Sequence, residues 1–383
     1  MKKEFGIYIH IPFCRQKCFY CDFPSFAGRE RFIDDYMLAL KEEIHKTKSN
    51  MGYGQDEKLQ PKTLYIGGGT PTVLAEEQLE KLFQLIHEEI SLDFCEEYTI
   101  EVNPGTVNEN KLKLLKNAGI TRLSIGVQSL DDKCLQAIGR IHNAQEAVDT
   151  VHQAQLLGLN NISIDLMYGL PGQTMAVLQE TLRQALKLKV QHISIYGLQL
   201  EEGTAFAKME AIGKLQLPAD EITEAMYDYI TSELPQQGYE RYEISNFAQK
   251  GFYSRHNMSY WQDKMYLGFG SGAHSYWQGK RLQNLADIPS YIKAVPENNW
   301  QELEEQVSEK EHMEEMCFLG LRTAEGINKK QFSQTFGRNL EEIYGDVIIR
   351  LTEKGLLKDK EDSCSLTLLG MRYGNQVFSE FLL

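Results

Sequence analysis

The sequence predicts an α/β fold in which parallel strands alternate with helices. Short runs rich in β-branched and aromatic residues recur through the first two hundred residues, and helical patterns separate them. After the second run, Leu79, Leu82, Phe83, Ile86 and Ile90 recur at helix spacing, which places one apolar face against a sheet. Six such repeats fit either an open doubly wound sheet or an incomplete barrel.

The strands of this sheet are predicted from runs with a period of two or with continuous apolar character. We expect them at Phe5–Ile11, Thr63–Ile66, Tyr98–Val102, Thr121–Val127, Ile162–Tyr168 and His192–Leu198. In both architectures the chemistry gathers at the carboxyl ends of the strands. Nearly every unusual residue of this chain follows one of these runs.

The alternation weakens after about residue 205. Aromatic residues and glycines concentrate between 241 and 305, and the segment 306–383 is typical of helices followed by a hairpin, as in a winged-helix unit. We therefore expect three parts, 1–240, 241–305 and 306–383. The stretch Glu311–Leu383 has 12 acidic and 9 basic residues, so packing against the first part is favoured over DNA binding.

Composition sets the class of protein. The 383 residues are 42% hydrophobic and 25% charged, as in an ordinary globular protein. No apolar run is long enough to span a membrane and the first residues lack a secretory signal, so we expect a cytoplasmic location, with peripheral membrane association as an option. The formal charge of −14 disfavours a nucleic-acid partner.

Three of the seven cysteines, Cys14, Cys18 and Cys21, lie within eight residues in the pattern CxxxCxxC. An odd total with a cluster of three argues against a disulfide scaffold. Three thiolates can hold one face of an iron–sulfur cluster and leave one iron open for a substrate. The alternative is a zinc site with His10 as its fourth ligand.

Further polar or glycine residues end four of the predicted strands. Gly67–Gly69 follow one strand and let the backbone approach a ligand closely. Glu101, Gln128 and Asp165 lie within or just after apolar strands, where an unpaired charge is costly. A shared polar ligand at one edge explains all of them, and Arg140 is a candidate partner for the carboxylates.

The segment Arg255–Trp261 places His256 among aromatic residues. This histidine is either a ligand of a metal or heme iron or a hydrogen-bonded residue of a packed aromatic turn. The sequence leaves both interpretations open.

Together these residues resemble the radical S-adenosylmethionine superfamily. The cysteine loop and the motifs IGGGTPT, EVNPG, GVQS and IDLMYGLPGQT are similar to its oxygen-independent coproporphyrinogen III oxidase branch, from Tyr8 to about residue 275, with weaker similarity beyond 310. Three departures resemble the heme-chaperone group of that branch rather than the oxidases. Phe23 replaces a fourth cysteine, only thirteen residues precede Cys14, and HNxxYW occupies His256–Trp261.

The resemblance implies an incomplete barrel of about six parallel strands and a 4Fe–4S cluster on Cys14, Cys18 and Cys21. It also implies that S-adenosylmethionine is bound by family positions, which in this chain are Tyr8, Tyr20, Gly68, Gly69, Thr70, Glu101, Gln128, Arg140 and Asp165. The first hypothesis is a heme chaperone that holds heme at His256 or a neighbouring residue and delivers it to a membrane hemoprotein acceptor, with flavodoxin or ferredoxin as electron donor. The alternatives are an oxidase that decarboxylates coproporphyrinogen III and a zinc-bound interaction module.

Overall fold

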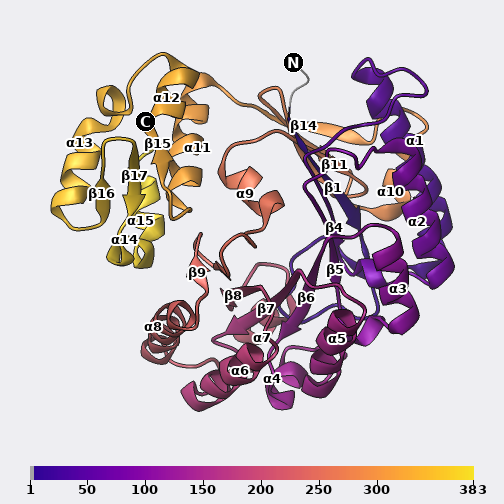
Figure 1. Ribbon diagram of the computed structural model, residues 1–383, viewed down its shortest axis with the longest axis horizontal. Helices are drawn as coiled ribbons and strands as arrows, with labels where there is room; N and C mark the ends of the chain where they lie inside the picture. Colours follow the sequence, from indigo (N-terminus) through magenta and orange to yellow (C-terminus); the bar gives the residue numbers. More distant parts are fainter. Residues whose placement is uncertain (1–3) are drawn as a thin grey trace.

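The computed structural model describes residues 4–383, and Figure 1 shows its long, curved sheet with helices around the outside. The strand order in this sheet is β14-β13-β12-β11-β1-β4-β5-β6-β7-β8-β10-β9. Six strands lie where the sequence predicts them: β1 (Gly6–Ile11), β4 (Thr63–Gly68), β5 (Glu97–Val102), β6 (Arg122–Gln128), β7 (Ile162–Tyr168) and β8 (His192–Gly197). Neighbours among them pair in parallel, so the α/β expectation of an incomplete parallel barrel is confirmed.

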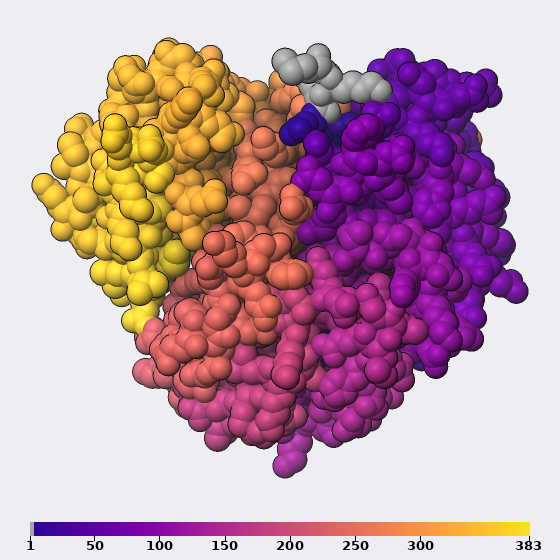
Figure 2. Space-filling view, viewed as in Figure 1, coloured from indigo at the N-terminus to yellow at the C-terminus, as the bar shows by residue number. Residues whose placement is uncertain are grey.

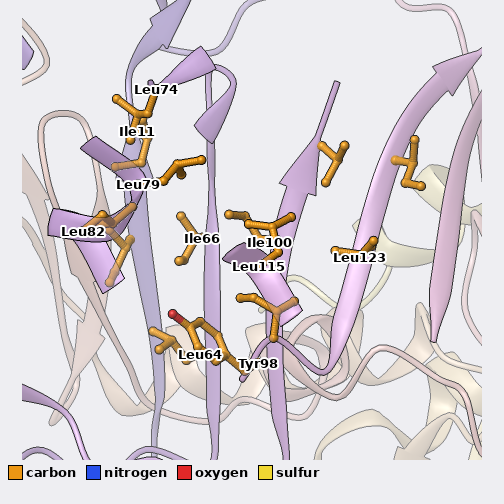
Figure 3. Close-up of a cluster of buried hydrophobic side chains, with 14 of the residues drawn as sticks. Ile11, Leu64, Ile66, Leu74, Leu79, Leu82, Tyr98, Ile100, Leu115 and Leu123 are labelled. Atoms are coloured by element: carbon orange, nitrogen blue, oxygen red, sulfur yellow. The ribbon is translucent and has the colours of Figure 1, made fainter. Parts of the chain in front are cut away.

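Helices follow these strands along the chain, and most of them lie around the outside of the sheet (Figure 1). They are α1 (Ile33–Asn50), α2 (Glu76–Glu89), α3 (Glu109–Asn117), α4 (Asp132–Ala137), α5 (Ala144–Leu156), α6 (Met175–Lys187), α7 (Ala205–Ala211) and α8 (Asp220–Gln236). The predicted apolar face of α2 is buried, with Leu79, Leu82 and Ile86 fully covered. Figure 3 shows Leu79 and Leu82 beside Ile11 and Ile66 of the sheet.

The period of two in the strands separates an apolar outer face from a polar inner face. Ile9, Ile66 and Ile100 are buried beneath the helices, and each such side chain contributes about 2 kcal/mol of hydrophobic stabilisation. The intervening residues point into the barrel, and they include Tyr8, Tyr65, Glu101, Ser124 and Asp165. An interior of this kind can hold a polar ligand.

The segment from 241 to 305 extends the same sheet at both edges. Its helices are α9 (Arg255–Trp261) and α10 (Ile288–Ala294). Its strands are β9 (Glu240–Arg241), which begins one residue before the segment, β10 (Asn246–Ala248), β11 (Tyr266–Phe269), β12 (His274–Trp277), β13 (Lys280–Asn284) and β14 (Gln301–Gln306). Strand β11 pairs in parallel with β1, which adds a parallel strand that the sequence did not predict. That this segment forms a separate domain stays a prediction.

The last part of the chain has its own core, built on Phe332, Tyr344, Cys364 and Phe381. It contains the helices α11 (Glu309–Leu321), α12 (Lys329–Phe336), α13 (Leu340–Glu353), α14 (Leu368–Arg372) and α15 (Gly374–Ser379) and the strands β15 (Ile327–Asn328), β16 (Leu357–Asp359) and β17 (Ser363–Leu366). The antiparallel pair β16–β17 is the predicted hairpin after helices. Among residues 4–383, no helix is both long enough and apolar enough to cross a membrane.

Candidate functional site

The three clustered cysteines lie on a loop that follows β1 at the carboxyl end of the barrel. Cys14 ends the short strand β2 (Phe13–Cys14), which pairs in parallel with β3 (Phe26–Ala27). Cys14 is buried, Cys18 and Cys21 are half-buried, and all three are free thiols. The loop is anchored by the Gln16 side chain, which donates to the carbonyl of Gly139 at 3.1 Å.

Each thiol has a polar neighbour. Cys14 Sγ lies 3.6 Å from Thr70 Oγ1, Cys21 Sγ lies 3.8 Å from Ser25 Oγ, and Arg140 Nη1 donates to Cys18 Sγ at 3.5 Å. Burial raises the pKa of Cys14 and of Cys21. The thiolate forms of these residues therefore need a bound cation or metal to become stable.

The turn Gly67–Gly69 at the end of β4, the glycine turn, lies directly against the cysteine loop. A Cβ atom on Gly69 would stand 2.9 Å from Cys14 Sγ and 2.8 Å from the carbonyl oxygen of Phe13. Gly68 has a φ of +116°, and a Cβ there would meet the ring of His10 at 2.8 Å. Both positions therefore require glycine, which brings bare backbone to the edge of the cysteine loop.

Glu101 projects from β5 to the same edge. Its carboxylate accepts hydrogen bonds from the Tyr65 hydroxyl at 2.9 Å and from the Gly68 N–H at 3.1 Å. Burial raises the pKa of Glu101 to about 7, and the charge of Asp165 adds to the effect. This buried carboxylate is therefore poised to gain from a cationic partner such as an ammonium group.

The polar set continues across β6 and β7. Ser124 Oγ donates to the Asp165 carboxylate at 3.1 Å, and burial raises the pKa of that carboxyl group. Arg140 Nη2 donates to the Gly126 carbonyl at 2.5 Å, while its buried Nε has no hydrogen-bond partner in the described chain. Gln128 adopts a left-handed φ of +65°, which marks a strained strand end.

Tyr8 and Tyr20 complete the residues expected around a cofactor. The Tyr8 hydroxyl donates to His10 Nδ1 at 3.0 Å, so Tyr8 faces the barrel interior. Burial raises the pKa of Tyr20, and the charge of Arg140 opposes this rise. Tyr20 therefore lies close to Arg140 beside the cysteine loop.

These residues fit a thiolate-bound cluster with an adjacent small-molecule ligand. The donor set is three soft sulfur atoms, the glycine turn leaves backbone open, and Arg140 Nε and the two buried carboxylates offer polar partners. Within residues 4–383, no three His, Cys, Asp or Glu side chains converge on a single ion, whereas each thiolate of an iron–sulfur cluster binds its own iron.

The zinc alternative also needs a free histidine, and His10 is not free. Its Nε2 donates to the Pro24 carbonyl at 2.9 Å, which leaves Nδ1 to accept from Tyr8. Burial lowers the pKa of His10 to about 4, consistent with this neutral form. His10 thus connects β1 to the residue that follows the cysteine loop.

His256 lies at the opposite end of the strands. Its Nδ1 is 2.8 Å from Thr63 Oγ1, its Nε2 is 2.7 Å from the Tyr260 hydroxyl, and its backbone N–H donates to Glu97. The ring is buried and stacks on Tyr65, and burial lowers the pKa of His256 to about 3. Both ring nitrogens are therefore hydrogen-bonded in this conformation, and the role of His256 as a heme ligand stays a prediction.

Tyr65 and Ser124 were not singled out from the sequence, although both belong to the site. Tyr65 stands between Tyr8 and His256 with ring centroids 6.1 and 5.1 Å away. The period of two could have identified them. Side chains two or four residues apart on a strand point to the same face of the sheet, and so do side chains directly opposite each other on paired strands.

Comparison with known proteins defines the class of protein to which this chain belongs. Residues 8–185 match the Radical SAM superfamily, and residues 307–373 match the HemN C-terminal domain. Coproporphyrinogen III oxidase (HemN) from Escherichia coli has the same fold, with a TM-score of 0.86 over 99% of this chain and 90% of that chain at 22% identity. The fold is that of a radical SAM protein with a HemN-type C-terminal domain, and the helices and hairpin at the end of the chain are that domain.

Full-length relatives identify the family more closely. The heme chaperone HemW of Bacillus subtilis is 41% identical over 98% of both chains, and that of Lactococcus lactis is 39% identical over 100% of this chain and 98% of its own. The Escherichia coli HemW is 38% identical over 70% of this chain and 69% of its own. The chain belongs to the HemW family.

Proposed function

We propose that this protein is a heme carrier that holds a resident 4Fe–4S cluster and S-adenosylmethionine at the carboxyl end of its barrel. The observation that carries the proposal is the loop of three free thiols against the glycine turn, in a chain that aligns over its full length with heme chaperones. Membership of the Radical SAM superfamily implies both cofactors.

The cluster would be held by Cys14, Cys18 and Cys21, with its remaining iron available to the amino and carboxylate groups of S-adenosylmethionine. Gly68, Gly69 and Thr70 would meet the methionyl part through backbone groups. The buried Glu101 carboxylate lies beside the Gly68 N–H and would attract the ammonium group.

The remaining predicted residues would surround the rest of the cofactor. Asp165 would accept hydrogen bonds from the ribose hydroxyls, and Tyr20 would lie near the adenine. Tyr8, Gln128 and Arg140 would enclose the site, with the unpartnered Arg140 Nε available to an anionic group. Cys14, Cys18 and Cys21 would hold a cluster that, once reduced, could supply one electron for the cleavage of S-adenosylmethionine.

The alternative function is oxidative decarboxylation of coproporphyrinogen III. The shared HemN fold makes it worth testing, although the identity is only 22% and the resemblance to the oxidases implies a further cysteine where this chain has Phe23. Turnover of coproporphyrinogen III under anaerobic, reducing conditions would establish this activity, and we expect none.

The test of the proposal is reconstitution under strict exclusion of oxygen. We expect about four irons and four sulfides per chain, an electron-paramagnetic-resonance signal that shifts on addition of S-adenosylmethionine, and saturable heme binding. Transfer of the heme to an apo-hemoprotein should follow. A reconstituted protein that binds no heme would contradict the carrier function, whatever its cluster content.

The partners belong to the same proposal. A low-potential donor such as flavodoxin or ferredoxin would reduce the cluster, and a hemoprotein in the membrane would accept the heme. Such an acceptor requires peripheral contact with the membrane, which co-sedimentation with acceptor-containing vesicles would test.

A further inference from the structure

A second hollow lies at the opposite end of the barrel from the cysteine loop. It has a volume of about 510 Å³ and is lined by residues at the amino ends of β1, β4 and β5, by α9 and its flanking residues, and by Glu240 and Glu325. A six-residue strand is about 20 Å long, so this hollow and the cysteine loop are separated by roughly that distance. We call it the α9 pocket. In Figure 2 the salmon-coloured residues of this region lie in the furrow between the yellow C-terminal residues and the indigo N-terminal ones.

The buried His256 determines which face of α9 looks into the pocket. Successive residues of an α-helix are rotated by about 100° around the axis. Met258 therefore lies about 200° from His256, and its side chain lines the pocket while the histidine is fixed to Thr63 and Tyr260. The histidine thus serves to orient the helix.

The walls of the pocket combine soft, aromatic and cationic groups. Met258 brings a thioether, and Tyr253 brings a ring that stacks on Tyr242 with centroids 4.4 Å apart and an interplanar angle of 13°. Lys250 and Lys264 are exposed at the pocket, and neither has a carboxylate within ion-pair distance in residues 4–383.

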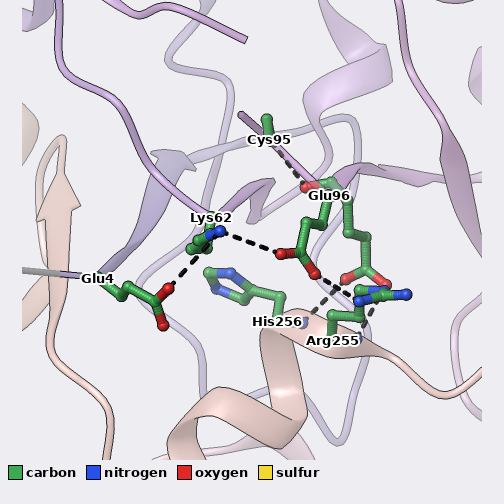
Figure 4. A network of polar contacts seen from close by, with 7 residues as sticks. Glu4, Lys62, Cys95, Glu96, Arg255 and His256 are labelled. Carbon is green, nitrogen blue, oxygen red and sulfur yellow. Dashed lines mark hydrogen bonds and ion pairs between the residues drawn. The ribbon is translucent and has the colours of Figure 1, made fainter. Parts of the chain in front are cut away.

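Most carboxylates of the pocket are already partnered. Figure 4 shows Lys62 between Glu4 and Glu96, and Arg255 on the other side of Glu96. The Tyr253 hydroxyl donates to Glu240 at 2.6 Å. The two unpaired lysines are therefore the groups most available to an anionic ligand.

We propose that the α9 pocket is the heme site of this chain, a proposal that rests on the function proposed above. The Met258 thioether faces the iron, Tyr253 packs against the flat macrocycle, and Lys250 and Lys264 pair with the propionates. Thioether sulfur is an axial ligand that heme iron accepts. The volume lies within the range of roughly 300–1,000 Å³ that is usual for ligand pockets.

The experiment is a hemin titration of the full-length chain, followed by the Soret and visible absorption bands. Met258→Leu removes the sulfur and retains the bulk, and we expect altered bands with a Kd raised about tenfold. Lys250→Gln with Lys264→Gln should raise the Kd about tenfold and weaken its dependence on salt. Met175→Leu on α6 is the matched control, since Met175 is also half-buried but lies outside the pocket, and we expect wild-type behaviour.

The outcomes separate the two proposals. If Met258→Leu and the double lysine variant both reproduce the wild-type bands and Kd, heme binds elsewhere and the α9 pocket is overturned while the carrier function stands. If the wild-type chain binds no heme, both proposals fail. If the Met175→Leu control changes as much as Met258→Leu, the effect is not specific to the pocket and the assignment is overturned.

Discussion

Arg140 donates a hydrogen bond from Nη1 to the Sγ of Cys18 at 3.5 Å, although 122 residues separate the two in sequence. Its Nη2 is fixed at the same time to the Gly126 carbonyl. A buried guanidinium is thus held beside the cysteine loop by the end of β6. With a cluster bound at the loop, this positive charge would stabilise the more negative, reduced form of the cluster.

Replacing Arg140 with Gln should lower the reduction potential of the reconstituted cluster, because a cation next to a ligand sulfur is lost. We expect a decrease of about 60 mV, the one-electron equivalent of a tenfold change in equilibrium. Potentiometric titration followed by electron paramagnetic resonance measures it. Arg183→Gln is the control, since Arg183 pairs with Glu180 on the exposed face of α6. An unchanged potential in Arg140→Gln would show that this guanidinium does not act on the cluster.

Gly69→Ala should impair assembly of the cluster, because the added Cβ would lie 2.9 Å from Cys14 Sγ and 2.8 Å from backbone. Backbone cannot move away as a flexible side chain would, so we expect the iron bound per chain to fall by half or more. Gly345→Ala is the matched control, because a Cβ there meets nothing within 4 Å. Its helical position in α13 should even stabilise the protein by up to about 1 kcal/mol. Full iron content in Gly69→Ala would contradict the close packing of glycine turn and cysteine loop.

The strands and the cysteine loop could be predicted because their signals are local. Strand β4 begins at Thr63 as predicted, and the outer face is read from alternating apolar residues. Strand β11 escaped prediction because Tyr266–Phe269 is short and contains glycine, and its partner β1 lies far away in the chain. Pairing over such a separation leaves no periodic signal.

The contacts of His256 could not be predicted from local sequence either. Its neighbours in the chain are aromatic, which suits a heme site as well as a packed turn. The decisive partners, Thr63 and Glu97, are 193 and 159 residues away. Only the folded chain shows that the ring is fixed between β4 and Tyr260.

The stabilising contribution of Glu43 should be lost as pH rises toward neutrality, while the buried His10 and His256, whose pKa values burial lowers, act in the opposite direction. This buried carboxyl group accepts hydrogen bonds from the Gly270 N–H at 2.8 Å and from Asn284 Nδ2 at 2.6 Å. Burial nevertheless raises its pKa to about 7. A carboxyl group with a raised pKa in the folded state stabilises the fold fully below its unfolded pKa and loses that contribution up to its folded pKa.

The contribution of Glu43 to the free energy of unfolding is therefore lost between about pH 4 and about pH 7, and the loss is on the order of 3 kcal/mol. Urea unfolding of the wild type and of Glu43→Gln at pH 5 and pH 8 measures it, and we expect the free energy of unfolding of the variant, relative to that of the wild type, to be higher at pH 8 than at pH 5. Burial also raises the pKa of Glu101 to about 7. Adding Glu101→Gln to Glu43→Gln should therefore remove a second, similar part of the pH dependence of the free energy of unfolding. Equal slopes in wild type and Glu43→Gln would contradict this origin.

Substitution of His256 distinguishes a structural role of this residue from a role as the heme ligand. His256→Gln retains a polar side chain but disrupts the paired contacts to Thr63 and Tyr260, and a buried group left unsatisfied costs about 1–3 kcal/mol. We therefore expect a lower free energy of unfolding together with an unchanged heme absorption spectrum in the folded fraction. His274→Gln is the control, since His274 is exposed and should affect neither quantity. If His256→Gln kept its stability but lost the heme spectrum, the histidine would be the iron ligand, and the ring would have to leave Thr63 and Tyr260 when heme binds.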